Sequence, residues 1–135
     1  MKNRSELREI IMKVLYQIEI LNETKIPYKV EDLIKEQLEV ENEFVNETIA
    51  GIEKNKKEII ELDNRYLNDW TMDRLNKVDK AIMLLGTYEL LYTDTPSVVA
   101  INEAIELSKE YSEEAVTKMI NGVLDKIYHE EGKDE

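Results

Sequence analysis

Apolar residues recur at helical spacing along most of the chain, and this pattern predicts an all-α fold of six to seven helices. Over residues 5–22 they form one broad stripe, made of Leu7, Ile10, Ile11, Val14, Leu15, Ile18 and Leu21. Ser5 is the expected N-cap of this helix. Shorter stripes predict helices over residues 30–38, from residue 42 onward, and over residues 59–70. The basic run at residues 54–57 is expected to be a break or a charged turn, and Gly51 is expected to let another helix approach closely.

The second half of the chain predicts a buried helix followed by an amphipathic pair. Residues 75–92 are apolar on most sides, which is typical of a central helix, and Thr71 is its expected cap with Asp73 in the first turn. Residues 96–128 predict two amphipathic helices joined by a short turn, with Ser112 as N-cap of the last one. Residues 129–135 are expected to form a frayed acidic tail. The whole chain, residues 1–135, is predicted to be a single compact domain.

Composition narrows the class of protein. Four Gly and two Pro in 135 residues leave little material for a turn-rich β fold. The absence of Cys excludes disulfides and thiolate metal sites and fits a reducing cytosol. No apolar run approaches the length of a membrane span. We therefore expect a cytoplasmic protein without a membrane partner.

The net charge of −12 argues against nucleic-acid binding, but the acidity is unevenly distributed. Residues 1–22 carry a balance of +1, from the cations Lys2, Arg4, Arg8 and Lys13 against the carboxylates Glu6, Glu9 and Glu19. The N-terminal helix is thus the one segment that is not acidic. The acidic remainder would suit a basic protein partner.

Catalytic and metal-binding patterns are missing from the sequence. The single histidine, His129, lies in the predicted tail, so it cannot anchor a catalytic or metal cluster. No phosphate-binding glycine motif occurs, and the Glu-x-x-His pairs of dimetal helical bundles are lacking. We expect neither an enzyme nor a cofactor nor a metal site.

Two polar constellations indicate a binding protein. Arg4, Arg8, Met12 and Tyr16 follow one another by four residues, and such a row could grip phosphates and stack a base. The alternative is that Tyr16 borders the core and the arginines are merely solvated. On the last helix, Lys118 and Asn121 share a face beside Gly122, where Asn offers a base both donor and acceptor atoms. The alternatives there are a buried Asn and a helix-packing Gly.

Five segments in order resemble the NusB family of bacterial transcription antitermination factors. They are RSELREIIMKVLYQIEI at 4–20, Tyr66-Leu67-x-x-Trp70, Arg74-Leu75-x-x-Val78-Asp79-Lys80-Ala81-Ile82, Tyr88-Glu89-Leu90-Leu91, and the pair VAINEAIELSK and KMINGVLDK. The resemblance implies an all-α bundle of two packed halves. It also implies binding of boxA-type single-stranded RNA together with the small-subunit ribosomal protein NusE. The resulting complex would act on RNA polymerase during transcription of ribosomal RNA operons.

Carried over position by position, the resemblance places an RNA surface on Lys2, Arg4, Arg8, Tyr16, Asp79, Lys80, Lys118, Met119 and Asn121. It places the NusE surface on parts of the central and C-terminal helices. Three departures from the family pattern predict weaker RNA binding without NusE. Ser5, Glu6 and Leu7 interrupt an arginine cluster, Leu84 replaces an arginine, and Met119 replaces an aromatic ring.

Two alternatives remain at this point. One is a helical interaction protein that has kept the fold and lost RNA binding. The other is the NusB-like domain that precedes an rRNA methyltransferase domain, which requires a catalytic domain after residue 135. Some family members self-associate, so a homodimer is a further expectation that the sequence leaves open.

Overall fold

A central helix, α4 (Lys77–Tyr92), organises the fold of the computed structural model, which describes residues 1–132. The other helices are α1 (Arg4–Thr24), α2 (Val30–Gln37), α3 (Glu43–Tyr66), the short 3-10 helix η1 (Met72–Arg74), α5 (Ser97–Tyr111) and α6 (Glu114–Glu131). α4 contacts α1, α3, α5 and α6, and its residues 81–85 are almost completely buried. The described residues contain no strand, and the predicted all-α class is confirmed.

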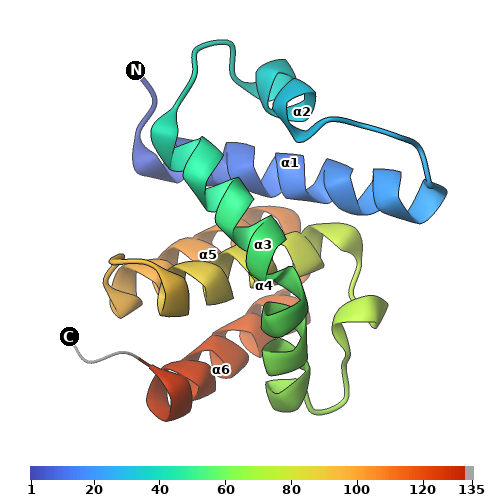
Figure 1. The fold of residues 1–135 in the computed structure, drawn as a ribbon. Coiled ribbons are helices and arrows are strands. Elements are labelled where there is room, and N and C mark those ends of the chain that lie inside the picture. The colour runs from blue at the N-terminus through green and yellow to red at the C-terminus, as the bar shows by residue number, and fades with distance from the viewer. Residues whose placement is uncertain (133–135) are drawn as a thin grey trace.

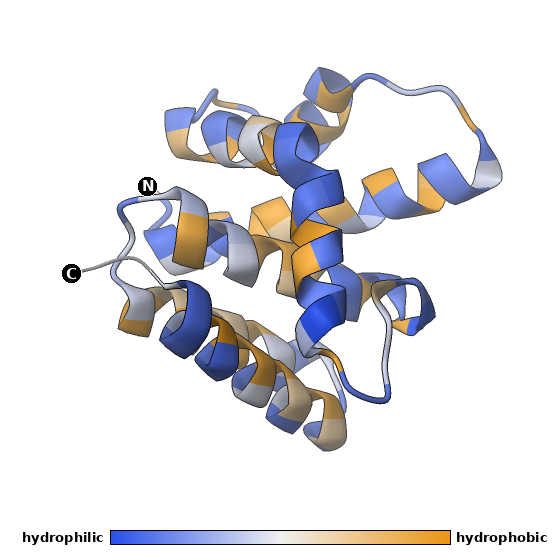
Figure 2. Cartoon of the chain, turned by 60° about the horizontal axis from the view of Figure 1, so that its bottom comes forward, coloured by the Kyte–Doolittle hydropathy of each residue, from blue (hydrophilic) through white to orange (hydrophobic). Residues whose placement is uncertain are grey.

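The helices form two packed groups around α4, as the family resemblance implies. α1 packs against α2 and the first part of α3, and α5 packs against α6 on the other side of α4 (Figure 1). α3 crosses both groups and also contacts α6. Hydrophobic and hydrophilic bands alternate along these amphipathic helices (Figure 2), as expected for elements with one buried side. No helix within residues 1–132 has the length and apolarity needed to cross a membrane.

The predicted break at residues 54–57 is wrong, because α3 runs without interruption from Glu43 to Tyr66. Lys56 lies against the body of the protein and pairs with Glu19 of α1 (2.5 Å) and Glu53 (3.2 Å). The Asn55 side chain donates a hydrogen bond to the Gly51 carbonyl (2.8 Å). The ion pairs of Lys56 and the hydrogen bond of Asn55 allow residues 54–57 to remain helical within α3.

Several helix ends differ from the sequence prediction because other side chains make the caps. Asn3, not Ser5, caps α1 through a capping box with Glu6. Thr71 is the N-cap position of the short helix η1, with Asp73 in its first turn, and not of α4. Asn76 caps α4 and accepts the Asp79 N–H (2.8 Å). Ser112 follows the end of α5 and does not cap α6, whose N-cap position is Glu113.

The helix predicted to reach Trp70 ends at Tyr66 instead. The Asn64 side chain accepts the Met72 N–H (2.8 Å) and so holds the following loop against the end of α3.

The two remaining local predictions have opposite outcomes. The close approach at Gly51 is confirmed, because a Cβ there would lie 1.9 Å from the hydroxyl of Tyr88 on α4. The frayed tail is wrong at its start, since α6 continues to Glu131. Tyr66 donates to Glu130 or Glu131 (3.1 and 2.7 Å) and so ties this end to α3. Residues 133–135 of the predicted tail lie outside the described residues.

Candidate nucleic-acid interface

The predicted RNA residues fall at two ends of the bundle. Lys2 and Arg4 lie at the start of α1, whereas Tyr16 lies three turns further along the helix, about 18 Å away. The C-terminal half of α1, the start of α4 and the start of α6 are on the same side of the molecule (Figure 1). We call this side the α4 end. It holds Tyr16, Asp79, Lys80, Lys118, Met119 and Asn121.

Arg8 is not part of an exposed row, because its side chain is buried in an ion pair. Only 4% of the residue is exposed. Its Nε and Nη2 donate to the two carboxylate oxygens of Glu89 on α4, at 2.7 and 2.9 Å. Glu103 of α5 lies 3.4 Å from Nη1. Met12, the next member of the predicted row, is also buried, so both the exposed row and the alternative of solvated arginines fail at Arg8.

Arg4 remains at the surface beside a shallow hollow. Its guanidinium lies over the Phe44 ring, 3.9 Å from the ring centre, in a cation–π contact. Arg4, Phe44 and Tyr88 line a hollow of about 620 Å³ together with Glu43 and Glu47. The two carboxylates offset the charge of Arg4, so this end of α1 is only weakly basic.

At the α4 end, charged side chains of the first turn of α4 hold neighbouring helices in place. Lys80 pairs with Glu19 of α1 (2.6 Å), and Lys77 pairs with Glu23. Asp79 is buried and accepts a hydrogen bond from Ser112 at the α5–α6 junction. The pKa of Asp79 is raised above its usual range, mainly because the carboxyl is buried. The hydrogen bond from Ser112 opposes this shift, and the negative charge of Glu113 adds to it. Asp79 and Lys80 therefore position this surface, and Tyr16, 36% exposed, presents its ring beside them.

Two of the three predicted residues of α6, Lys118 and Asn121, are exposed. The Lys118 side chain is 77% exposed, and its pair with Glu114, which is also exposed, is weak at 3.6 Å. Asn121 is exposed, which excludes the alternative of a buried Asn. Gly122 packs against nothing, because a Cβ there would have no neighbour within 4 Å, so the helix-packing alternative is wrong as well. Met119 is half-buried and lies on the neighbouring stripe of the helix.

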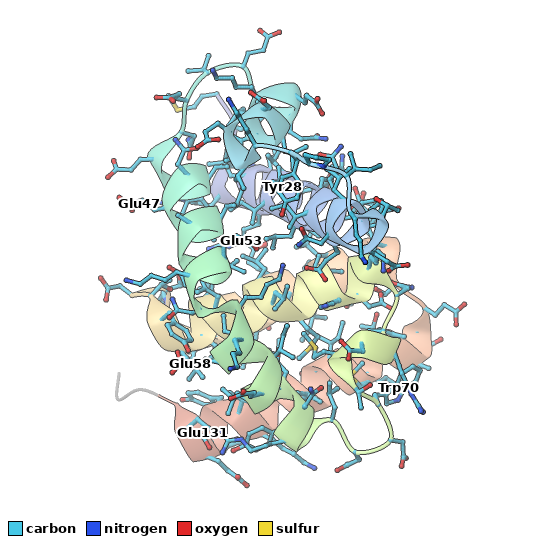
Figure 3. All side chains as sticks on the ribbon, turned by 45° about the vertical axis from the view of Figure 1, so that its right-hand side comes forward. Tyr28, Glu47, Glu53, Glu58, Trp70 and Glu131 are labelled. Carbon is cyan, nitrogen blue, oxygen red and sulfur yellow. The ribbon has the colours of Figure 1, made fainter. Side chains whose placement is uncertain are left out.

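Sequence reasoning missed one exposed aromatic ring next to these residues. Trp70 is 41% exposed on the loop between α3 and η1 (Figure 3). It lines a hollow of about 270 Å³ with Met119, Gly122 and Lys126. The sequence signal was the tryptophan itself, which the pattern assigned to the end of a buried helical stripe.

The position of Leu84, where the family pattern has an arginine, lies in the core of this structure. Leu84 is completely buried within α4. A side chain at this position points into the core, so the replacement of an arginine by Leu84 removes no cation from a surface.

The described residues show no alternative centre of metal chemistry. Within residues 1–132, no three His, Asp or Glu side chains gather in a way that could hold a metal ion. What the arrangement offers is a mixed polar and aromatic surface with a few free cations.

Comparison with known proteins gives a consistent result. The NusB family profile matches residues 5–129. The transcription antitermination protein NusB of Clostridium perfringens (strain SM101 / Type A) is 39% identical over 132 residues, covering 93% of this chain and 96% of that protein. Its counterpart in Listeria innocua is 37% identical over 129 residues, covering 95% of this chain and 98% of that protein.

Solved structures agree with these relatives. T. maritima NusB superposes with a TM-score of 0.82 at 36% identity, covering 96% of this chain and 92% of that chain. A crystal structure of the antitermination factors NusB and NusE in complex with dsRNA has the same fold, with a TM-score of 0.80. Its identity is 24%, over 93% of this chain and 96% of that chain.

Proposed function

The chain belongs to the NusB family, and from this membership we propose that it is a transcription antitermination factor. In this proposal it binds boxA-type single-stranded RNA together with the small-subunit ribosomal protein NusE. The complex joins RNA polymerase in the cytoplasm during transcription of ribosomal RNA operons. The chain acts by binding and carries out no catalysis of its own.

The exposed polar residues of α6 at the α4 end are the observation that supports RNA binding best. Lys118 can reach a phosphate, and Asn121 can donate to and accept from the edge of an unpaired base. Tyr16 presents a ring on which a second base can stack. Lys2 and Arg4 provide further phosphate contacts at the other end of α1.

Arg8, Asp79 and Lys80 support this surface from behind. Arg8 joins α1 to α4 through Glu89, and Lys80 joins the same two helices through Glu19. Asp79 holds the α5–α6 junction through Ser112. Their role in RNA binding is therefore to position the helices that carry the exposed residues.

The charge of the chain makes a protein partner necessary for tight binding. A net charge of −12 repels the RNA backbone, and few cations on the proposed surface offset it. A basic partner such as NusE is attracted by the acidic surface and contributes its own cations. We expect weak RNA binding by the isolated chain and much tighter binding by the complex.

A fluorescence-anisotropy titration of boxA-like single-stranded RNA, with and without NusE, tests this function. With NusE present, Lys118→Ala should weaken binding and reduce the slope of log K against log salt by about 1. Lys35→Ala removes an exposed lysine of α2 that lies outside the proposed RNA surface, and it serves as the matched control. Equal affinity for boxA-like and scrambled RNA in the complex would contradict the proposal.

The burial of Arg8 favours a second candidate, a protein-interaction module on the NusB fold with reduced RNA binding. Burial removes one cation from the surface on which RNA would lie. In the same titration this candidate predicts that NusE binds normally while RNA does not bind above the scrambled control.

A further inference from the structure

Gly122 is a glycine in the middle of a helix that no packing contact explains. It lies in α6 (Glu114–Glu131), where Gly costs about 1 kcal/mol relative to Ala. Gly51 in α3 has a clear reason, because Tyr88 occupies the space of its missing Cβ. At Gly122 the same space is open, with no atom within 4 Å. The missing side chain therefore leaves room for something outside the chain.

The open space beside Gly122 belongs to the hollow of about 270 Å³ that Trp70 lines. Met119, Gly122 and Lys126 are three, four and seven residues apart, so they form one stripe of α6 along its wall. Because Gly122 has no side chain, the helix backbone forms a flat floor at this point. The hollow is smaller than typical small-molecule pockets, and its size favours a single flat group.

Trp70 is held in place although its ring is exposed. Leu67 and Met72, on either side of it in the loop, are buried at 4% and 0% exposure. Asn64 fixes the same loop by accepting the Met72 N–H at 2.8 Å. The indole thus stands at the rim of the hollow on a loop anchored at both ends. A ring fixed in this way loses little entropy when it stacks on a ligand.

The charges around the hollow differ between its two sides. Lys126 is exposed and forms no ion pair with any carboxylate of residues 1–132. Asp69 lines the hollow from the loop that carries Trp70, whereas Lys126 lines it from α6. A phosphate is attracted to the Lys126 side and repelled from the Asp69 side, which sets the direction in which a nucleotide can enter.

We propose that Trp70, Met119 and Gly122 form a subsite for one unpaired RNA base, with Lys126 contacting the adjacent phosphate. The base stacks on the indole and lies against the backbone of α6 at Gly122, as aromatic side chains commonly hold single-stranded bases. Trp70 then provides the ring that Met119 lacks. The inference rests on the proposed RNA-binding function and adds a location and a residue to it.

Trp70 is the only tryptophan of the chain, so its fluorescence reports on this subsite directly. The complex of the full chain with NusE is titrated with boxA-like RNA, and anisotropy of the labelled RNA is recorded beside tryptophan emission. Trp70→Phe in the same complex gives the background emission. We expect RNA to quench the Trp70 signal over the concentration range in which anisotropy rises, and Trp70→Ala to weaken RNA binding about tenfold or more.

Gly122→Leu tests the floor of the hollow without removing any group that contacts RNA. Leu favours a helix more than Gly, so the variant should fold at least as well as the original chain. It should weaken RNA binding about tenfold by filling the space of the base. Ala50→Leu adds a similar bulk at an exposed position of α3 and should leave RNA binding unchanged.

The outcomes separate this inference from the proposed function. If anisotropy shows tight RNA binding while Trp70 emission stays constant and Gly122→Leu binds normally, the subsite is wrong and the RNA-binding function stands. Quenching by NusE alone, with no further change on adding RNA, would assign the hollow to the protein partner and overturn the inference. If RNA does not bind the original complex at all, the proposed function fails and the subsite fails with it.

Discussion

Arg8 and Glu89, 81 residues apart in the sequence, form a buried ion pair with two hydrogen bonds of 2.7 and 2.9 Å. Thr95 donates a further hydrogen bond to Glu89 (3.0 Å), and Glu103 lies on the other side of the guanidinium. The pair fastens α1 to the central helix α4. A residue that the sequence offers to RNA is therefore part of the scaffold.

Substitution of Arg8 should lower the free energy of unfolding, because the residue belongs to the scaffold and does not contact RNA directly. Arg8→Ala leaves the Glu89 carboxylate buried without its cation, which typically costs about 3–5 kcal/mol. Arg4→Ala removes only an exposed cation–π contact and should cost less than about 1 kcal/mol. Urea denaturation of the two variants measures the difference. Similar unfolding free energies for both would mean that the buried pair is not structural.

Asp63 should make the protein less stable as the pH rises. Burial raises the pKa of Asp63 to about 8, and the hydrogen bond from Thr87 (2.6 Å) only partly opposes this shift. Between the unfolded pKa of about 3.9 and the folded value, the native state holds a proton that the unfolded state has lost. The contribution of this group to stability is thus complete below about pH 4 and decreases by about 1.4 kcal/mol per pH unit toward pH 8.

Asp63→Asn, an uncharged group of the same shape, should remove this dependence. We expect the variant to gain stability relative to the original chain as the pH is raised from 5 to 8, measured by urea unfolding at each pH. Asp125→Asn, at an exposed position of α6, is the control. Parallel pH profiles for Asp63→Asn and the original chain would contradict the raised pKa.

The two helical glycines should respond in opposite ways to the same substitution. Gly51→Ala places a Cβ 1.9 Å from the Tyr88 hydroxyl and 2.4 Å from the ring, so helix α4 or the tyrosine must shift, at a cost of about 1–3 kcal/mol. Gly122→Ala meets no atom and should stabilise the protein by up to about 1 kcal/mol. Thermal unfolding of both variants measures the two effects. A destabilised Gly122→Ala would show that the hollow has a structural role.

The sequence predicts the helices well and their ends poorly, for a physical reason. Helical spacing of buried residues is a property of each helix alone, so the stripe of α1 and the apolar α4 were identified correctly. The uninterrupted α3 depends on Glu19, a residue of another helix that pairs with Lys56. Such a contact between distant segments leaves no local pattern.

The functional surface shows the same limit. Types of residue that suit RNA could be recognised at Arg8 and Lys118, but only the fold separates the buried arginine from the exposed lysine. Trp70 is hydrophobic, so the local pattern assigned it to the core although its ring is exposed. Its neighbours Met119 and Gly122 follow it by about fifty residues, and only tertiary packing brings them together.

Mapping of RNA onto the protein by NMR tests the central claim most directly. In the complex of the ¹⁵N-labelled chain with unlabelled NusE, adding boxA-like RNA should shift the amide signals of residues 118–126, the Tyr16 region and the Trp70 indole. A separate set should shift at Lys2 and Arg4. The guanidinium signal of Arg8 should stay in place, because its pair with Glu89 persists. Shifts centred on Arg8 and the Phe44 hollow, with α6 unchanged, would contradict an RNA surface at the α4 end.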